Sequence, residues 1–126
     1  MPKLNQVRCV LAVNDYKKSA EFYREKLGFK LDTEVDRWFF LSRDNFKVML
    51  GHCPNEVSAS KVGDHSWFAY AYIEDIDGLH SEYKRNGVKI IQEISEKPWG
   101  MREFCIETPD GHRIMFGQEL EQKNVT

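Results

Sequence analysis

Residues 108–117 read TPDGHRIMFG and residues 42–51 read SRDNFKVMLG, so one ten-residue pattern occurs twice in this chain. Three pairs of positions correspond: Asp44 with Asp110, Asn45 with Gly111, and Met49 with Met115. Asp-Asn and Asp-Gly pairs tolerate the positive φ angles of tight turns, and an apolar strand follows each pair. The pattern therefore predicts two equivalent β-hairpins.

A second repeat precedes each hairpin. Residues 12–31 (AVNDYKKSAEFYREKLGFKL) and 72–91 (YIEDIDGLHSEYKRNGVKII) share the order of a strand, an aspartate, a helix and a glycine. We expect Asp15 and Asp75 to cap the helix N-termini, and Gly28 and Gly87 to end the helices. Apolar residues recur at helical spacing, as Tyr16, Ala20, Tyr23 and Leu27 in the first helix and Ile76, Leu79 and Tyr83 in the second. Each half thus predicts a strand, a helix and three strands, which is an α+β fold.

The length and composition fit one domain. The chain has 126 residues, of which 41% are hydrophobic and 13% aromatic, and this is enough to build a core. We expect a single domain over residues 1–126, with module one at about 5–53 and module two at about 64–119, because these ranges bracket the two repeats.

The net charge, the N-terminal sequence and the cysteines indicate which partners and which cellular location to expect. The formal net charge is -2 with both signs interspersed, which favours neither a nucleic-acid partner nor a membrane partner. The N-terminal MPKLNQ does not resemble a signal peptide, so a cytoplasmic location is expected. Cys9, Cys53 and Cys105 are far apart and form no CxxC pair, so we expect three reduced thiols, two of them inside strands.

The duplicated pattern resembles a known family. NDYKKSAEFYREKLGF near the start and PWGMREFCIETPDGHRIMFGQ near the end are similar to the vicinal oxygen chelate superfamily. This superfamily includes glyoxalase I, extradiol dioxygenases, fosfomycin-resistance enzymes and bleomycin-resistance proteins. The resemblance covers nearly the whole chain and is closest to the metal-free bleomycin-resistance branch. It implies two tandem βαβββ modules in a cupped, incompletely closed eight-stranded barrel, and a homodimer.

The resemblance also locates four metal-ligand positions. Metal-dependent members carry two histidines and two carboxylates on the concave face, and the matching positions here are Arg8, Met49, Phe68 and Met115. Zinc, nickel, iron and manganese need imidazole and carboxylate donors, which this set lacks. We therefore expect neither metal nor cofactor, and the metal-dependent reactions of the family are disfavoured.

Strand alternation predicts which side chains line the cup. The first and fifth strands would present Arg8, Val10 and Ala12, and Phe68, Tyr70 and Tyr72. If four-residue loops close both hairpins, Trp38 and Phe40 lie beside Met49 and Lys47, and Arg102, Phe104 and Ile106 lie beside Met115 and Arg113. A one-residue bulge would invert the third or seventh strand. With Trp99, which resembles the loop tryptophan at the family's pocket mouth, the predicted ligand-binding set is Arg8, Trp38, Phe40, Met49, Phe68, Tyr70, Trp99, Arg102, Phe104, Arg113 and Met115.

This lining suits a flat aromatic ligand, and its cationic groups (Arg8, Lys47, Arg102 and Arg113) favour an anionic one. The alternative is that the methionines and aromatics are core residues and the arginines are surface residues. His52, His65, His80 and His112 are expected on the surface.

Three functions remain open from the sequence. The first is sequestration of a small molecule without metal. The second is a divergent lyase or dioxygenase-like enzyme of the same superfamily that uses tyrosine or arginine side chains. The third is a structural or regulatory module. No Ser/His/Asp or Cys/His arrangement and no glycine-rich phosphate loop is recognised, so no catalytic residue is assigned.

Overall fold

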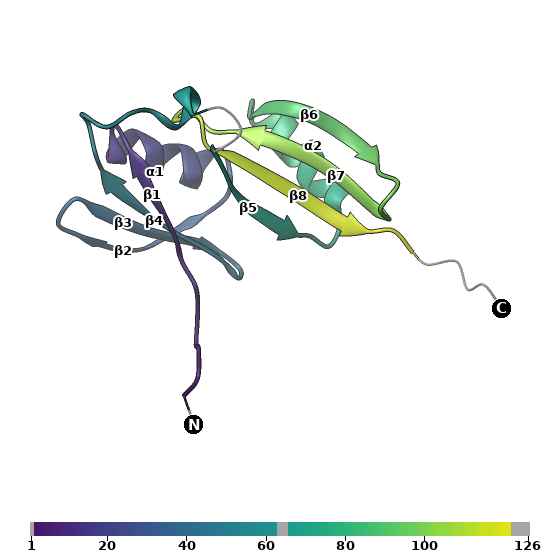
Figure 1. Cartoon of the computed structure of the whole chain (residues 1–126), viewed down its shortest axis with the longest axis horizontal. Coiled ribbons are helices and arrows are strands. Elements are labelled where there is room, and N and C mark those ends of the chain that lie inside the picture. The colour runs from purple at the N-terminus through teal and green to yellow at the C-terminus, as the bar shows by residue number, and fades with distance from the viewer. Residues whose placement is uncertain (1, 63–65, 122–126) are drawn as a thin grey trace.

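The computed structural model describes residues 2–62 and 66–121 and contains two modules of the same element order (Figure 1). Module one contains β1 (Cys9–Val13), α1 (Tyr16–Glu25), β2 (Lys30–Val35), β3 (Trp38–Arg43) and β4 (Phe46–His52). Module two contains β5 (Trp67–Tyr72), α2 (Ile76–Arg85), β6 (Lys89–Glu96), β7 (Met101–Glu107) and β8 (Arg113–Glu119), and a short 3-10 helix, η1 (Ala59–Lys61), lies between them. The predicted tandem βαβββ order is confirmed.

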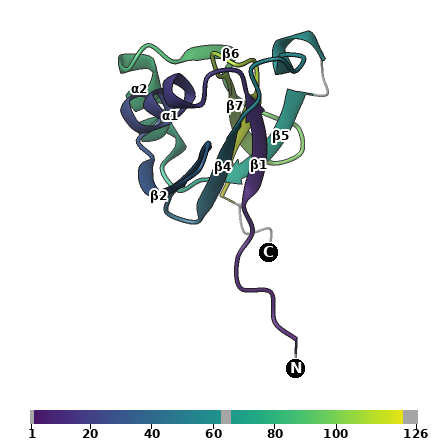
Figure 2. The same ribbon diagram turned by 90° about the vertical axis from the view of Figure 1, so that its left-hand side faces the viewer.

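Each module forms one four-stranded sheet. The strand order is β1-β4-β3-β2 in the first sheet, here called sheet A, and β5-β8-β7-β6 in sheet B. In each sheet the first strand runs parallel to the last and the other pairs are antiparallel. Among the described strands no pairing joins sheet A to sheet B, so the eight strands do not close. Both helices lie on one side of the two sheets (Figure 2), and the opposite side of each sheet is called its open face below.

The helices begin and end as their sequences predict. The Asp15 side chain accepts a hydrogen bond from the Lys18 amide, and the Asp75 side chain accepts one from the Gly78 amide. Gly87 has a φ of 77°, which lets the Gly87 and Val88 amides bond back to Lys84 and Tyr83 and so satisfy carbonyls at the end of α2.

Both predicted apolar helix faces are buried. The buried residues of these faces are Ala20, Tyr23 and Leu27 from the first helical segment and Ile76 and Tyr83 from the second. They pack on inner strand residues such as Leu41, Leu50, Ile106 and Phe116 to form the core. No described helix combines the length and apolar character needed to cross a membrane.

The two hairpins differ by one residue, and this corrects part of the predicted lining. In the first hairpin Ser42 pairs with Lys47 across four residues, whereas in the second Glu107 pairs with Arg113 across five. The extra residue belongs to a turn in which the Gly111 amide bonds to the Thr108 carbonyl and Gly111 has a φ of 92°.

This difference changes the face of β7 but leaves β3 as predicted. Phe40 pairs with Met49, but Cys105, and not Phe104 or Ile106, pairs with Met115. The placement of Arg102, Phe104 and Ile106 beside Met115 is therefore wrong, because one added residue inverts the whole strand. These three side chains lie on the helix side. Phe104 stacks on Phe116 at 5.2 Å, and Arg102 binds Asp77 of α2 at 2.8 Å.

A second irregularity moves Phe68 off the open face. The pairing of β5 with β8 shifts between Trp67 and Ala69, so that Trp67 pairs with Arg113 and Tyr70 with Met115. Phe68 instead packs against the rings of Phe46 and His112, with centroid distances of 6.3 and 5.7 Å. The predicted equivalence of Phe68 with Arg8 is therefore wrong in space, and Trp67 takes its place.

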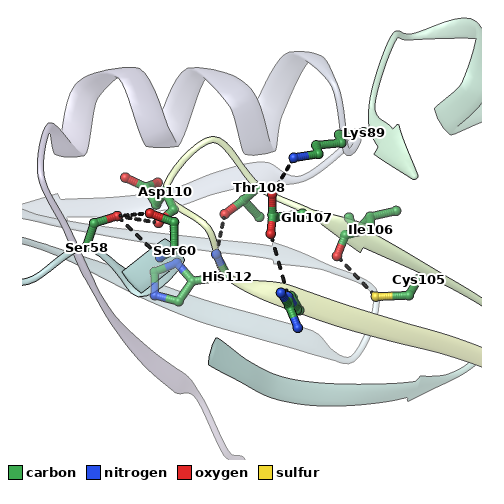
Figure 3. A network of polar contacts seen from close by, with 10 residues as sticks. Ser58, Ser60, Lys89, Cys105, Ile106, Glu107, Thr108, Asp110 and His112 are labelled. Atoms are coloured by element: carbon green, nitrogen blue, oxygen red, sulfur yellow. Dashed lines mark hydrogen bonds and ion pairs between the residues drawn. The ribbon is translucent and has the colours of Figure 1, made fainter. Parts of the chain in front are cut away.

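The modules hold each other by crossed contacts. At the tip of the first hairpin, Arg43 bonds to both carboxylate oxygens of Glu82 on α2, at 2.7 and 3.1 Å. At the tip of the second, Asp110 accepts a 2.6 Å hydrogen bond from Ser19 on α1. The Asp110 carbonyl also accepts a hydrogen bond from Ser58, as Figure 3 shows. Each hairpin tip is therefore fixed to the helix of the other module.

Candidate functional site

The open face of sheet A is centred on Met49. Phe40 lies opposite Met49, and Trp38 lies opposite Gly51. A Cβ added at Gly51 would come within 2.7 Å of the Trp38 ring, so the glycine lets this ring lie close to the sheet. Trp38, Phe40 and Met49 are thus brought together as predicted.

Arg8 lies at the edge of this face, and its guanidinium group is engaged in contacts within the protein. Its guanidinium lies 5.2 Å from the Phe40 ring centroid and bonds to Asp32 at 3.1 Å and to the Leu41 and Val48 carbonyls. Burial raises the pKa of Asp32, but hydrogen bonds from Ser42 and Arg8 outweigh it and the pKa is lowered overall. Arg8 therefore has an internal counter-ion.

The open face of sheet B carries a buried carboxylate. Glu103, opposite Gly117, is 3% exposed and accepts hydrogen bonds from the Tyr70 hydroxyl at 2.6 Å and the Trp99 indole at 2.9 Å. A Cβ at Gly117 would collide with the Tyr70 hydroxyl. The glycine therefore lets the Tyr70 side chain, from β5, pass over β8 and reach Glu103 on β7. Burial and the adjacent Glu103 both raise the pKa of Tyr70, which keeps the phenol protonated.

Farther along the same face, the basic side chains of Lys89 and Arg113 lie beside the carboxylate of Glu107. Arg113 lies 5.7 Å from the Trp67 ring centroid and 3.6 Å from Glu107, and Lys89 binds Glu107 at 2.8 Å. Figure 3 shows the Lys89 contact beside Cys105. Hydrogen bonding to Lys89 is the main cause that lowers the pKa of Glu107, and burial raises the pKa of Cys105 to about 12. The Cys105 thiol is therefore protonated and unreactive at neutral pH.

A groove of about 1030 Å³ runs along the free edge of β5, between the modules. It is bounded by β1, by the tip of the first hairpin and by α2, and Tyr70 and Tyr72 stand on its rim. This groove is therefore next to the open face of sheet B and not at its centre. The two tyrosines belong to both.

The structure sorts the predicted ligand-binding residues into two groups. Arg8, Trp38, Phe40, Met49, Tyr70, Arg113 and Met115 lie on open faces, and Trp99 lies at the rim of sheet B. Phe68, Arg102 and Phe104 do not. Sequence reasoning missed Trp67, Glu103, Cys105 and Glu107. Glu103, Cys105 and Glu107 reach the open face because the second hairpin is one residue longer than the first. Pro109 and Gly111 are the sequence feature that favours this longer turn.

The charge of the site also differs from the expectation. Arg102 lies on the far side of the sheet, and Arg8 and Arg113 have carboxylates as neighbours. Lys47 remains on the open face of sheet A, while Glu103 and Glu107 add negative charge to sheet B. The open faces therefore carry both acidic and basic groups and do not favour an anionic ligand.

The four metal-ligand positions implied by the family do not fit a hard divalent ion. Met49 and Met115 are on the open faces, but a thioether is a weak ligand for such ions. Arg8 is cationic, and Phe68 has no donor atom and points elsewhere. Within residues 2–62 and 66–121 no three His, Cys, Asp or Glu side chains are grouped so that they could hold a metal ion. His112, predicted on the surface, is 9% exposed, and His65 lies outside the described residues.

Comparison with known proteins agrees with this architecture. A bleomycin resistance protein of Geobacillus stearothermophilus is 28% identical over 124 residues, covering 88% of this chain and 94% of the relative. The bleomycin-binding protein of Streptomyces verticillus, solved with copper(II)-bleomycin, superposes with a TM-score of 0.70 at 22% identity, covering 97% of this chain and all of that one. A glyoxalase/bleomycin resistance protein/dioxygenase from Alicyclobacillus acidocaldarius gives a TM-score of 0.79 at 16% identity, covering 93% and 92%.

The matching family model spans residues 4–116, from before β1 to the middle of β8. The paired βαβββ modules, the repeated hairpins and this match lead to one assignment. The chain belongs to the glyoxalase/bleomycin resistance protein/dioxygenase superfamily.

Proposed function

We propose that this protein binds a flat organic molecule on the aromatic open faces of its sheets and sequesters it without chemical change or metal. One repeated arrangement carries the proposal. A glycine on an inner strand lies under an aromatic ring in each module, Gly51 under Trp38 and Gly117 under Tyr70. A methionine, Met49 or Met115, stands two residues before each glycine. Such rings stack on flat ligands, and thioethers adapt to irregular shapes.

The names of the relatives suggest the first ligand to test. Bleomycin resistance proteins share 28% identity over nearly the whole chain, and one solved neighbour carries copper(II)-bleomycin. We therefore take bleomycin or a related glycopeptide as the leading ligand. The proposed contacts are Arg8, Trp38, Phe40, Met49, Tyr70, Trp99, Arg113 and Met115.

A divergent lyase or dioxygenase-like activity is the second candidate. The observation that favours it is the 2.6 Å hydrogen bond between Tyr70 and Glu103, an acid pair on the open face. To act as a general acid, Tyr70 would turn its single hydroxyl proton from Glu103 to a reacting group. This candidate requires product to form, whereas sequestration requires the ligand to be recovered intact.

We also propose a homodimer. Neither sheet is closed by the other within one chain, and Val10 on the open face of sheet A is 62% exposed. Large apolar side chains exposed in this way are typical of surfaces that a partner covers. Sedimentation equilibrium should give about twice the mass of one chain, and a monomer at micromolar concentration would contradict the proposal.

The test of binding is calorimetric titration with metal-free bleomycin and with copper(II)-bleomycin, followed by mass spectrometry of the recovered ligand. Trp38→Leu should weaken binding by about tenfold or more, because a stacking anchor is lost. Val57→Ala, at an exposed residue of the linker, is the matched control and should bind like the unmodified protein. Equal affinities for all three would contradict the site, and a product of altered mass would favour the enzyme.

A further inference from the structure

Glu103 is a carboxylate without a counter-ion. Both of its hydrogen bonds, from the Tyr70 hydroxyl and the Trp99 indole, end on the same oxygen, Oε2. In the part of the chain that the structure describes, no basic side chain forms an ion pair with it. Glu107, four residues farther along β7, has Lys89 at 2.8 Å. The two acids of this face therefore differ, because of the two only Glu107 has basic neighbours.

The surroundings of Glu103 are built by specific features of the chain. Tyr70 comes from β5 and reaches β7 only because Gly117 on the intervening strand has no side chain. Trp99 comes from the turn before β7, which is fixed by hydrogen bonds from the Gly100 amide to Lys97 and from the Leu120 amide to the Gly100 carbonyl. Two rings from different elements are thus anchored on one carboxylate.

These rings form an exposed aromatic surface. The Tyr70 and Tyr72 ring centroids are 5.2 Å apart, and Tyr70, Tyr72 and Trp99 are 40%, 76% and 64% exposed. Glu103 lies beneath them at 3% exposure. The surface that a ligand meets is therefore aromatic, while the charge behind it is negative.

This combination has a defined electrostatic preference. The faces of aromatic rings attract cations, most strongly those of tryptophan and tyrosine. A carboxylate that accepts hydrogen bonds from the ring substituents adds its own negative potential at short range. Because the rings cover the carboxylate, a hydrated inorganic ion gains little there, whereas an alkylammonium or guanidinium group can rest on the ring faces.

We propose that Tyr70, Tyr72, Trp99 and Glu103 form a subsite for an organic cation carried by the flat ligand. The inference rests on the proposed binding function and adds the charge class of the ligand, which the sequence alone had favoured as anionic. Glu103 acts here as a specificity-determining residue. Glu103 favours a positively charged ligand group, and it does so through the Tyr70 and Trp99 rings that are hydrogen-bonded to it.

Three probes with one ring system test the subsite: 2-naphthylmethylammonium, 2-naphthylmethanol and 2-naphthylacetate. Each is titrated by calorimetry, and the indole N–H signal of Trp99 is followed by NMR of ¹⁵N-labelled protein. Glu103→Gln keeps an acceptor for both donors but removes the charge. Glu25→Gln, at the exposed last residue of α1, removes one negative charge away from the open faces and is the control.

The cationic probe should bind the unmodified protein about fivefold to tenfold more tightly than the neutral one, and should shift the Trp99 signal. Glu103→Gln should reduce this ratio to about one, and Glu25→Gln should leave it unchanged. Equal binding of all three probes would overturn the subsite but leave the aromatic site intact. If none of the probes binds, the proposed function fails together with the subsite.

Discussion

Two tyrosines on equivalent helices have hydroxyl groups in opposite situations. Tyr23 and Tyr83 are each 1% exposed. The Tyr83 hydroxyl donates to the Leu27 carbonyl at 3.0 Å, and this bond joins the two modules. The Tyr23 hydroxyl is buried and has no hydrogen-bond partner among the residues that the structure describes. The burial of Tyr23 raises its pKa, so it stays neutral.

This contrast predicts unequal effects of the same substitution. Tyr83→Phe should lower the free energy of unfolding by about 1 kcal/mol, because the Leu27 carbonyl loses one of its two donors and keeps only Arg43 at 2.9 Å. Tyr23→Phe should leave it unchanged or raise it slightly, because a buried hydroxyl without a partner is removed. Urea denaturation of both variants measures the difference. A loss of stability at Tyr23→Phe as large as that at Tyr83→Phe would contradict the account.

His112 predicts a dependence of stability on pH. Burial lowers its pKa below the ordinary 6.5, with Asp110 opposing the shift. The unfolded chain therefore binds a proton near pH 6.5 while the folded chain does not, so stability is full above this pH and falls as the pH decreases below it. His112→Gln should flatten the slope of unfolding free energy between about pH 7 and 5. His80→Gln, at a histidine that packs on Phe104 and lies 2.9 Å from Glu93, is the comparison. An unchanged slope in His112→Gln would contradict the assignment.

At the scale of elements, the sequence predicts what repeats and fails where the repeats differ. The strand and helix order, both N-caps and the lining of β3 follow from patterns present in both halves. The face of β7 does not, because the second hairpin has five residues where the first has four. A single added residue reverses every side chain of a strand. The sequence therefore predicts Arg102 and Phe104 on the open face, where the structure has Glu103.

Which side chains of β5 lie on the open face could not be predicted from the sequence either. The register shift between Trp67 and Ala69 has no marker in the sequence, since no glycine or proline stands in the strand. Phe68 packs between Phe46 and His112, contacts that depend on how the modules meet. Packing between modules therefore decides this part of the site.

The turn that inverts β7 is itself testable. Gly111 and Gly87 both have positive φ, but a Cβ would meet the Ser60 backbone only at Gly111 and nothing within 4 Å at Gly87. Gly87→Ala should cost about 1 kcal/mol of unfolding free energy from backbone strain alone. Gly111→Ala should cost clearly more, about 2 to 4 kcal/mol, because the linker must also move. Thermal and urea unfolding compare the two, and equal losses would show that the contact with Ser60 is unimportant.

At the scale of the molecule, the crossed hairpin contacts are expected to couple the modules. The Arg43 and Glu82 side chains are 32% and 28% exposed and share two hydrogen bonds. A double-mutant cycle with Arg43→Ala and Glu82→Ala should give a coupling energy of about 1 kcal/mol. The pair of Lys84 and Glu93, about 60% exposed, is the control and should show little or no coupling, because solvent screens it. Equal coupling in the two pairs would contradict a special role for the hairpin tip.

The molecule as a whole presents two aromatic open faces, and the central claim is that a flat ligand binds there. The most direct measurement is NMR of ¹⁵N-labelled protein during titration with metal-free bleomycin, observing the indole N–H signals of Trp38, Trp67 and Trp99. All three rings lie on the open faces or their rim. The account predicts saturable shifts of Trp38 and Trp99, with the amides of α1 and α2 unaffected. Shifts confined to the helices, or no shift at millimolar ligand, would contradict it.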